Sequence, residues 1–289
     1  MSIVRSYGKG LQEATMGGRS VLVLWAVSAA FAAAVYFVAA RVLAESLARS
    51  LSGDGFLSGG AADAILEVLT GSGPVLSALA GLGLALLAFY QLVTPFLYGG
   101  VLSEIVRPRE AKSFAASFWM GGGKYYGRFF RLSLASILLW VPAVFLFILA
   151  GRGLAAVKAD PVRESVQVYL ILARIAVGLF LFFLVKMVLD YARIRIAVME
   201  SRSALAALGW AALFVLRKPF KTLGLYYLLG LTSLAGSALY GLAQAGFARS
   251  TTLAVLAGFG LAQLHILWRC WIKVAYQAGE FKLYLEETP

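Results

Sequence analysis

The sequence predicts an all-α, polytopic membrane protein with six transmembrane helices. Hydrophobic residues make up 61% of the 289 residues and charged residues only 14%, whereas a soluble domain has about 45–50% apolar and roughly 25% charged residues. The apolar residues form six runs, each near the ~20 residues that a helix needs to cross a bilayer. No polar stretch is long enough for a separate soluble domain, so we expect one membrane domain over residues 1–289.

The apolar runs place the six spans in order along the chain. The first run is longer than the ~7–15 residues of the hydrophobic part of a cleaved signal peptide, so we expect it to remain as a span. Pro95 and Pro142 fall inside the second and third spans, where neighbouring helices can satisfy the freed carbonyl groups. The fourth span can extend as a helix to about Met199, which is longer than the bilayer requires. The predicted spans cover residues 21–40, 75–102, 132–150, 166–190, 222–247 and 251–270.

The distribution of Lys and Arg predicts the orientation. Of the 26 basic residues, 18 lie before the first span, in the second-to-third and fourth-to-fifth connections, or from the end of the sixth span onward; six lie on the opposite side and two inside the fourth span. Because basic loops remain cytoplasmic, both termini are expected in the cytoplasm. The Ala-, Gly- and Leu-rich composition favours a bacterial inner membrane. The net charge of +12 does not indicate nucleic-acid binding, because the basic residues adjoin apolar runs and suit anionic headgroups.

The two basic connections are each predicted to hold a short interfacial helix. Glu110-Ala-Lys-Ser precedes the first such helix, and Glu200-Ser-Arg-Ser precedes the second, ninety residues later. Basic segments at 128–131 and 218–221 follow the two helices, and a further Glu280-Phe-Lys follows the sixth span. This pattern predicts three helix-hairpin repeats. A biased composition can also produce this small number of identical residues by chance. The sequence therefore leaves both a true repeat and a chance match open.

Charged residues on the fourth and sixth spans form the candidate polar cluster. Their spacing of three or four residues puts the members from each span on one helical face. The cluster comprises Lys186, Asp190 and Arg193 on the fourth span and His265, Arg269 and Lys273 on the sixth. One interpretation is a basic cleft, with Asp190 as counter-ion, that suits an anionic headgroup or solute. The other is that these side chains reach the cytoplasmic boundary and bind phospholipid without selectivity.

Position along the helix favours the second interpretation, because Lys186 lies about 37 Å from Pro161 at ~1.5 Å per residue. His265 is the only histidine, so we expect it to make a structural hydrogen bond rather than to act as a ligand. A second basic group flanks the spans on the predicted cytoplasmic side and is expected to contact lipid headgroups. Its members are Arg128, Arg131, Arg217, Lys218 and Lys221.

The sequence holds no motif for catalysis, metal binding or a cofactor, and none of these is expected. The segment 121–124, Gly-Gly-Gly-Lys, lacks two residues of a phosphate-binding loop, because Phe118 and Tyr125 stand in place of the required Gly and Ser/Thr. It predicts a helix terminator and hinge instead. The single cysteine, Cys270, excludes an internal disulfide. The acidic residues of the first outer loop favour a solvated face over a divalent-cation site: Asp54, Asp63 and Glu67.

Residues 189–229 carry a resemblance to known proteins. Asp190-Tyr-Ala-Arg, Glu200, an Ala/Leu helix and a basic-aromatic start of the fifth span are similar to a pattern in uncharacterised bacterial six-span proteins. These include the membrane domain that is fused in some proteins to glycerophosphodiester phosphodiesterases. The resemblance covers only this segment and implies the six-span architecture; no phosphodiesterase domain is present in the 289 residues.

The sequence has features that are typical of interfaces, such as basic interfacial segments and a bulky fourth span, and it has no catalytic motif. It therefore predicts a non-enzymatic integral membrane subunit or scaffold. Its expected partners are anionic membrane lipids and another membrane protein or a second copy, for which the bulky fourth span is suited. The alternative is a small transporter or permease component that carries an anionic or amphiphilic solute past Lys186, Asp190 and Arg269. A lipid enzyme would require acidic residues from distant loops to converge.

Overall fold

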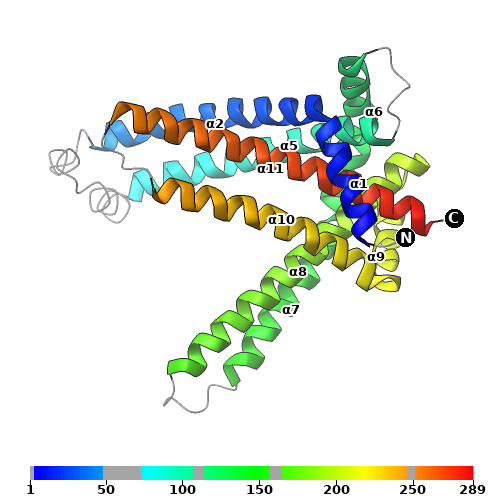
Figure 1. The fold of residues 1–289 in the computed structure, drawn as a ribbon. Coiled ribbons are helices and arrows are strands. Elements are labelled where there is room, and N and C mark those ends of the chain that lie inside the picture. The colour runs from blue at the N-terminus through cyan, green and yellow to red at the C-terminus, as the bar shows by residue number, and fades with distance from the viewer. Residues whose placement is uncertain (1–2, 48–72, 107–112, 157–163, 247–250, 289) are drawn as a thin grey trace. The chain divides into compact units, whose positions relative to one another are not determined.

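The computed structural model describes residues 3–47, 73–106, 113–156, 164–246 and 251–288 (Figure 1). Every regular element in these ranges is an α-helix, which confirms the predicted all-α class. The helices are α1 (Ile3–Met16), α2 (Gly18–Leu47), α5 (Gly73–Val106), α6 (Phe114–Ala135), α7 (Ile137–Ala156), α8 (Glu164–Met199), α9 (Ala204–Arg217), α10 (Pro219–Ala245) and α11 (Thr252–Glu287).

Within the described ranges, six segments are long and apolar enough to cross a membrane, which is the number predicted: Gly18–Arg41, Ala80–Val106, Phe114–Gly153, Gln167–Met199, Pro219–Ala245 and Thr252–Glu287. The chain is therefore a multi-pass membrane protein. Pro95 and Pro142 lie inside α5 and α7 without ending them. Helix α11 continues past the predicted end of its span to Glu287, so the sixth span and the predicted tail form one helix. The acidic residues of the predicted first outer loop, Asp54, Asp63 and Glu67, lie outside the described residues.

The prediction that Gly121, Gly122 and Gly123 end a helix is wrong, because all three lie inside α6. Their role is close packing. A Cβ on Gly99 of α5 would lie 3.2 Å from the Gly122 Cα, and a Cβ on Gly121 would overlap the Ser103 side chain. The glycines thus let residues 95–106 of α5 approach α6 backbone to backbone, as small residues do in membrane helix pairs.

The chain divides into two units, Val23–Thr94 and the remainder, Met1–Leu22 with Pro95–Pro289. In the first unit the Phe31 ring of α2 stacks on the Phe89 ring of α5, with centroids 6.0 Å apart. In the second unit the largest fully buried side chains include Tyr125 of α6, Tyr191 of α8 and Tyr284 of α11. The core of this unit therefore lies around α8, against which α6, α9 and α11 all pack.

Helix α8 has two different halves. Its residues from Val185 to Ala197 are mostly buried in the core, whereas Phe182, Leu179 and earlier apolar residues are exposed. The exposed half packs against α7, and the α7–α8 hairpin diverges from the α10–α11 pair (Figure 1). A hollow can therefore form where α8 separates from α10 and α11.

The proposed repeat recurs in the helix caps but not in the helices that follow them. The Ser113 hydroxyl accepts from the Ala116 amide at 3.3 Å at the start of α6, and Ser203 accepts from Ala206 at 3.2 Å at the start of α9. Such caps satisfy amide groups that have no partner inside the helix. After its cap α6 continues for 22 residues, whereas α9 ends after 14 at a basic junction before α10. The two copies therefore begin alike and diverge.

Candidate functional site

A cavity of about 290 Å³ lies where α8 separates from α10 and α11. It brings together four of the six residues in the predicted polar cluster, namely Lys186, Asp190, Arg269 and Lys273. The other residues of its wall were not predicted, because they lie on faces of helices whose mutual orientation the sequence does not show. They are Tyr98, Phe182, Phe183, Tyr226, Ser233, Ile272, Tyr276 and Gln277.

Three basic side chains line this cavity. Lys186 comes from α8, and Arg269 and Lys273 come from neighbouring turns of α11. In the part of the chain that the structure describes, none of the three makes a hydrogen bond or an ion pair. Three cations around one small cavity repel one another unless an anion lies between them. We call this group the open basic cluster.

Asp190 does not neutralise the open basic cluster. Its Oδ1 is bonded to the Arg193 Nη1 one turn later on α8, and both side chains are only 12% exposed. The Arg193 guanidinium also lies 4.1 Å from the centroid of the Tyr98 ring. The aspartate and the arginine thus form a self-contained pair at the cavity wall, and the charge of Asp190 is already balanced.

Aromatic side chains form a fixed wall on the α10 side. The Tyr226 and Tyr276 rings have centroids 4.8 Å apart, and the Tyr276 hydroxyl donates to the Tyr226 carbonyl oxygen at 3.0 Å. Phe183 of α8 packs against Tyr226 at 5.9 Å. These contacts join all three helices around the cavity, so the positions of its basic residues are set by packed neighbours.

His265 lies outside the cavity lining. Its ring stacks on Tyr240 of α10, with centroids 4.4 Å apart and planes inclined by 11°. Among the described residues, His265 therefore contacts Tyr240 by ring stacking, whereas the sequence predicted a hydrogen bond for His265.

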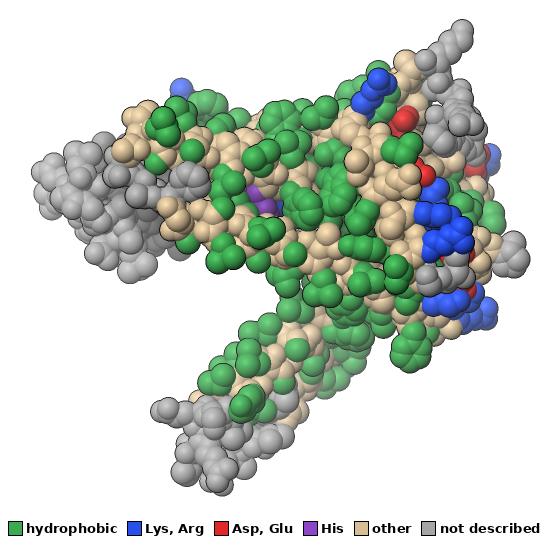
Figure 2. Space-filling view, in the orientation of Figure 1, with side chains coloured by type: hydrophobic (Ala, Val, Ile, Leu, Met, Phe, Trp, Pro, Cys, Tyr) green, Lys and Arg blue, Asp and Glu red, His purple; other side chains and the backbone are tan. Residues whose placement is uncertain are grey.

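The predicted headgroup-binding residues do not form one cluster. Lys218 and Lys221 at the start of α10 both bond to the Glu287 carboxylate at the end of α11, and we call these three residues the closed basic cluster. Lys and Arg side chains gather at this end of the second unit (Figure 2). Arg131 Nε donates to the Gly127 carbonyl at 3.2 Å, Arg217 is exposed, and Arg128 is half-buried with Nη1 unbonded in the described chain.

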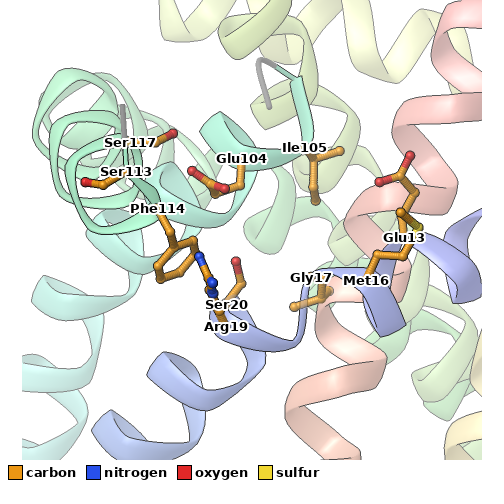
Figure 3. Close-up of a pocket in the computed structure, with 11 residues that line it drawn as sticks. Glu13, Met16, Gly17, Arg19, Ser20, Glu104, Ile105, Ser113, Phe114 and Ser117 are labelled. Carbon is orange, nitrogen blue, oxygen red and sulfur yellow. The ribbon is translucent and has the colours of Figure 1, made fainter. Parts of the chain in front are cut away.

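A second hollow, of about 490 Å³, lies among α1, the start of α2, residues 104–105 of α5 and the start of α6. Figure 3 shows Arg19 and Ser20 beside Phe114, with Glu104 opposite and Glu13 beyond Gly17. Its two carboxylates and one arginine leave it close to neutral, and Glu13 already pairs with Lys282 at 2.9 Å. The charges that line this hollow therefore favour neither an anionic nor a cationic ligand.

Comparison of the chain with protein-family models, curated proteins and solved structures finds no match. The resemblance of residues 189–229 to six-span bacterial proteins therefore stays a prediction.

Proposed function

We propose that this protein is a non-enzymatic membrane subunit or scaffold that binds an anionic phospholipid by its phosphate in the cavity between α8, α10 and α11. The observation that carries the proposal is the open basic cluster, in which Lys186, Arg269 and Lys273 line one cavity with no partner in the described chain. Charge-assisted hydrogen bonds to phosphate oxygens would satisfy these donors and offset their mutual repulsion.

The surroundings of the cavity favour a lipid over a free anion. Exposed apolar side chains continue from the cavity along α8, α10 and α11. They include Leu179 and Phe182 on α8, Leu231 and Leu234 on α10, and Leu264 on α11. A phosphate held at the basic residues would leave the acyl chains of its lipid in contact with these side chains, where burial of apolar surface adds to the affinity.

Two matched double variants test this proposal. Lys186→Gln with Lys273→Gln removes two charges from the open basic cluster, and Lys218→Gln with Lys221→Gln removes two from the closed one. Binding of dihexanoylphosphatidylglycerol to the detergent-solubilised full chain is measured by native mass spectrometry. We expect the first variant to bind about tenfold more weakly or worse, which corresponds to about 1.4 kcal/mol or more, and the second to bind nearly as the wild type does.

Equal losses in the two variants, or no binding by the wild type, would contradict the proposal. Inorganic phosphate at the same concentration serves as a competitor that lacks acyl chains. Weak competition supports a lipid site, whereas full competition would assign the cavity to a free anion.

A solute pathway is the second candidate, because Lys186 and Asp190 lie within the span Gln167–Met199 rather than on a loop. It requires water to reach the cavity. Ser233→Cys places a thiol in the lining, while the native Cys270 is buried and serves as the unlabelled background. Labelling by a membrane-impermeant maleimide in intact vesicles supports a water-filled pathway, and a thiol that stays unlabelled from both sides of the membrane contradicts it.

A further inference from the structure

A group of buried polar side chains without partners lies next to the cavity. Glu280 of α11 is 1% exposed, and neither of its carboxyl oxygens has a hydrogen-bond partner in the described chain. The same holds for the Gln277 Oε1 and the hydroxyls of Tyr191 and Tyr284, which are also buried. Buried polar groups are nearly always hydrogen-bonded, so these four residues, grouped beside one cavity, need a physical explanation.

These four residues lie in one place. Gln277, Glu280 and Tyr284 are spaced by three and four residues and so share a face of α11. Tyr191 of α8 and Tyr284 both pack on the Phe214 ring of α9, at 5.0 and 6.2 Å. Gln277 also lines the cavity, which places Glu280 about one helical turn further along α11 from the cavity wall.

The charged groups around Glu280 come mainly from α8. Lys186, Asp190 and Arg193 are all within electrostatic range of its carboxyl group. The phenol groups of Tyr191 of α8, Tyr226 of α10 and Tyr276 of α11 are within the same range. Helix α1 buries Ser6, Gly10 and Ala14, none of which titrates, and α9 has one ionisable side chain, Arg217, at its exposed end. Since Arg193 is bonded to Asp190, Lys186 is the nearby cation that remains available.

An ionised carboxylate in this position is costly. Removing a carboxylate from water without hydrogen bonds costs several kcal/mol, whereas a neutral carboxyl group avoids most of that cost. A proton on Glu280 also provides a donor in a place where the Gln277 oxygen and two hydroxyl oxygens lack hydrogen bonds. The geometry therefore favours the protonated form.

We propose that Glu280 is a proton-binding site beside the anion cavity, and that proton binding at Glu280 and anion binding at Lys186 strengthen each other. The coupling part rests on the proposed function; the proton site itself does not. When Glu280 loses its proton, the new negative charge attracts Lys186 and repels an anion in the cavity. Anion affinity therefore falls as pH rises through the deprotonation of Glu280, and the bound anion in turn holds the proton more tightly, because such coupling is reciprocal.

Infrared difference spectroscopy of the full chain in nanodiscs tests the proton site. At neutral pH the wild type should show the carbonyl-stretch band of a protonated carboxyl group, and the band should disappear on titration to alkaline pH. Glu280→Gln should lack this band, whereas Glu13→Gln, which changes a carboxylate paired with Lys282, should retain it. A wild type without a protonated carboxyl band at neutral pH overturns the proposal, and this measurement does not depend on whether a variant folds.

Binding of dihexanoylphosphatidylglycerol at mildly acidic and at alkaline pH tests the coupling, since the charge of this phosphodiester is constant across that range. Wild-type affinity should fall about tenfold as pH rises, while Glu280→Gln should retain its affinity within roughly twofold. Equal pH dependence in the two proteins overturns the coupling and leaves the lipid site intact. A carboxyl band without any lipid binding would instead contradict the proposed function and leave the proton site standing.

Discussion

Two groups of basic residues in the second unit differ in whether an acid reaches them. In the closed basic cluster, Glu287 bonds both Lys218 and Lys221, and its side chain is 9% exposed. In the open basic cluster, the acid in the lining, Asp190, is held by Arg193 instead. Both groups look the same in the sequence, as bases beside apolar runs. The comparison teaches that a basic residue in a membrane protein becomes a candidate ligand site only once its possible acidic partners have been located.

The largest expected effect comes from closing the open cluster. Arg193→Gln removes the partner of Asp190, which then lies beside the three bases of the open basic cluster. Loss of one member of a buried ion pair costs about 3 kcal/mol or more, and pairing of Asp190 with Lys186 would compete with an anion. We expect a lower Tm and at least a roughly tenfold loss of phosphatidylglycerol affinity.

Arg195→Gln is the matched control for this change. Arg195 lies two residues later on α8 and its guanidinium is 4.2 Å from the centroid of the Trp210 ring, away from the cavity lining. It should leave lipid affinity unchanged. If both variants lose affinity equally, Arg193 acts through general stability and the distinction between open and closed clusters fails.

An intermediate effect is expected from opening the closed cluster. Glu287→Gln removes the charge that holds Lys218 and Lys221. Because these lysines are 37% and 45% exposed, water screens the pair and the loss of stability should be about 1 kcal/mol. The freed lysines should then retain additional anionic lipid, measured as a second weakly bound lipid by native mass spectrometry. An unchanged lipid count would show that two unpaired lysines without a cavity do not make a site.

The smallest effect is expected at Arg217, which is exposed and belongs to neither cluster. Arg217→Gln should change the free energy of unfolding by less than about 0.5 kcal/mol and leave lipid affinity within roughly twofold. Thermal unfolding and lipid titration of this variant measure the background for the two larger changes. A large loss of affinity here would mean that the headgroup contacts a wider basic surface.

Much of the fold follows from the sequence because hydrophobic length is a strong signal in membranes. The six spans and the extension of α8 to Met199 were both predicted from apolar runs. The prediction for the glycines at 121–123 was wrong because a glycine run can have either of two roles. It can end a helix in water, or it can allow two membrane helices to pack closely. Only the contact with Gly99 and Ser103 on α5 distinguishes them.

The candidate site was predictable in part. Spacing placed Lys186 with Asp190 on one face of α8 and Arg269 with Lys273 on one face of α11, and these faces do meet. Spacing alone did not show that Arg193 would take up the charge of Asp190. Nor did it single out Glu280, which the sequence presents as one more charge in a polar tail, because its burial depends on α8, α9 and α11 packing together.

The packing of α1 on α11 has a consequence for biosynthesis. The two helices approach so closely that a Cβ on Gly10 would lie 2.8 Å from the Gly279 Cα, and Ser6 bonds to Glu286, 280 residues later, at 3.3 Å. Because α1 lies so far ahead of α11 in the chain, the ribosome makes α1 well before its binding face on α11. Until α11 has been made, the amphipathic α1 must therefore remain without this native partner, so the two helices can pack together only after the spans between them have been synthesised.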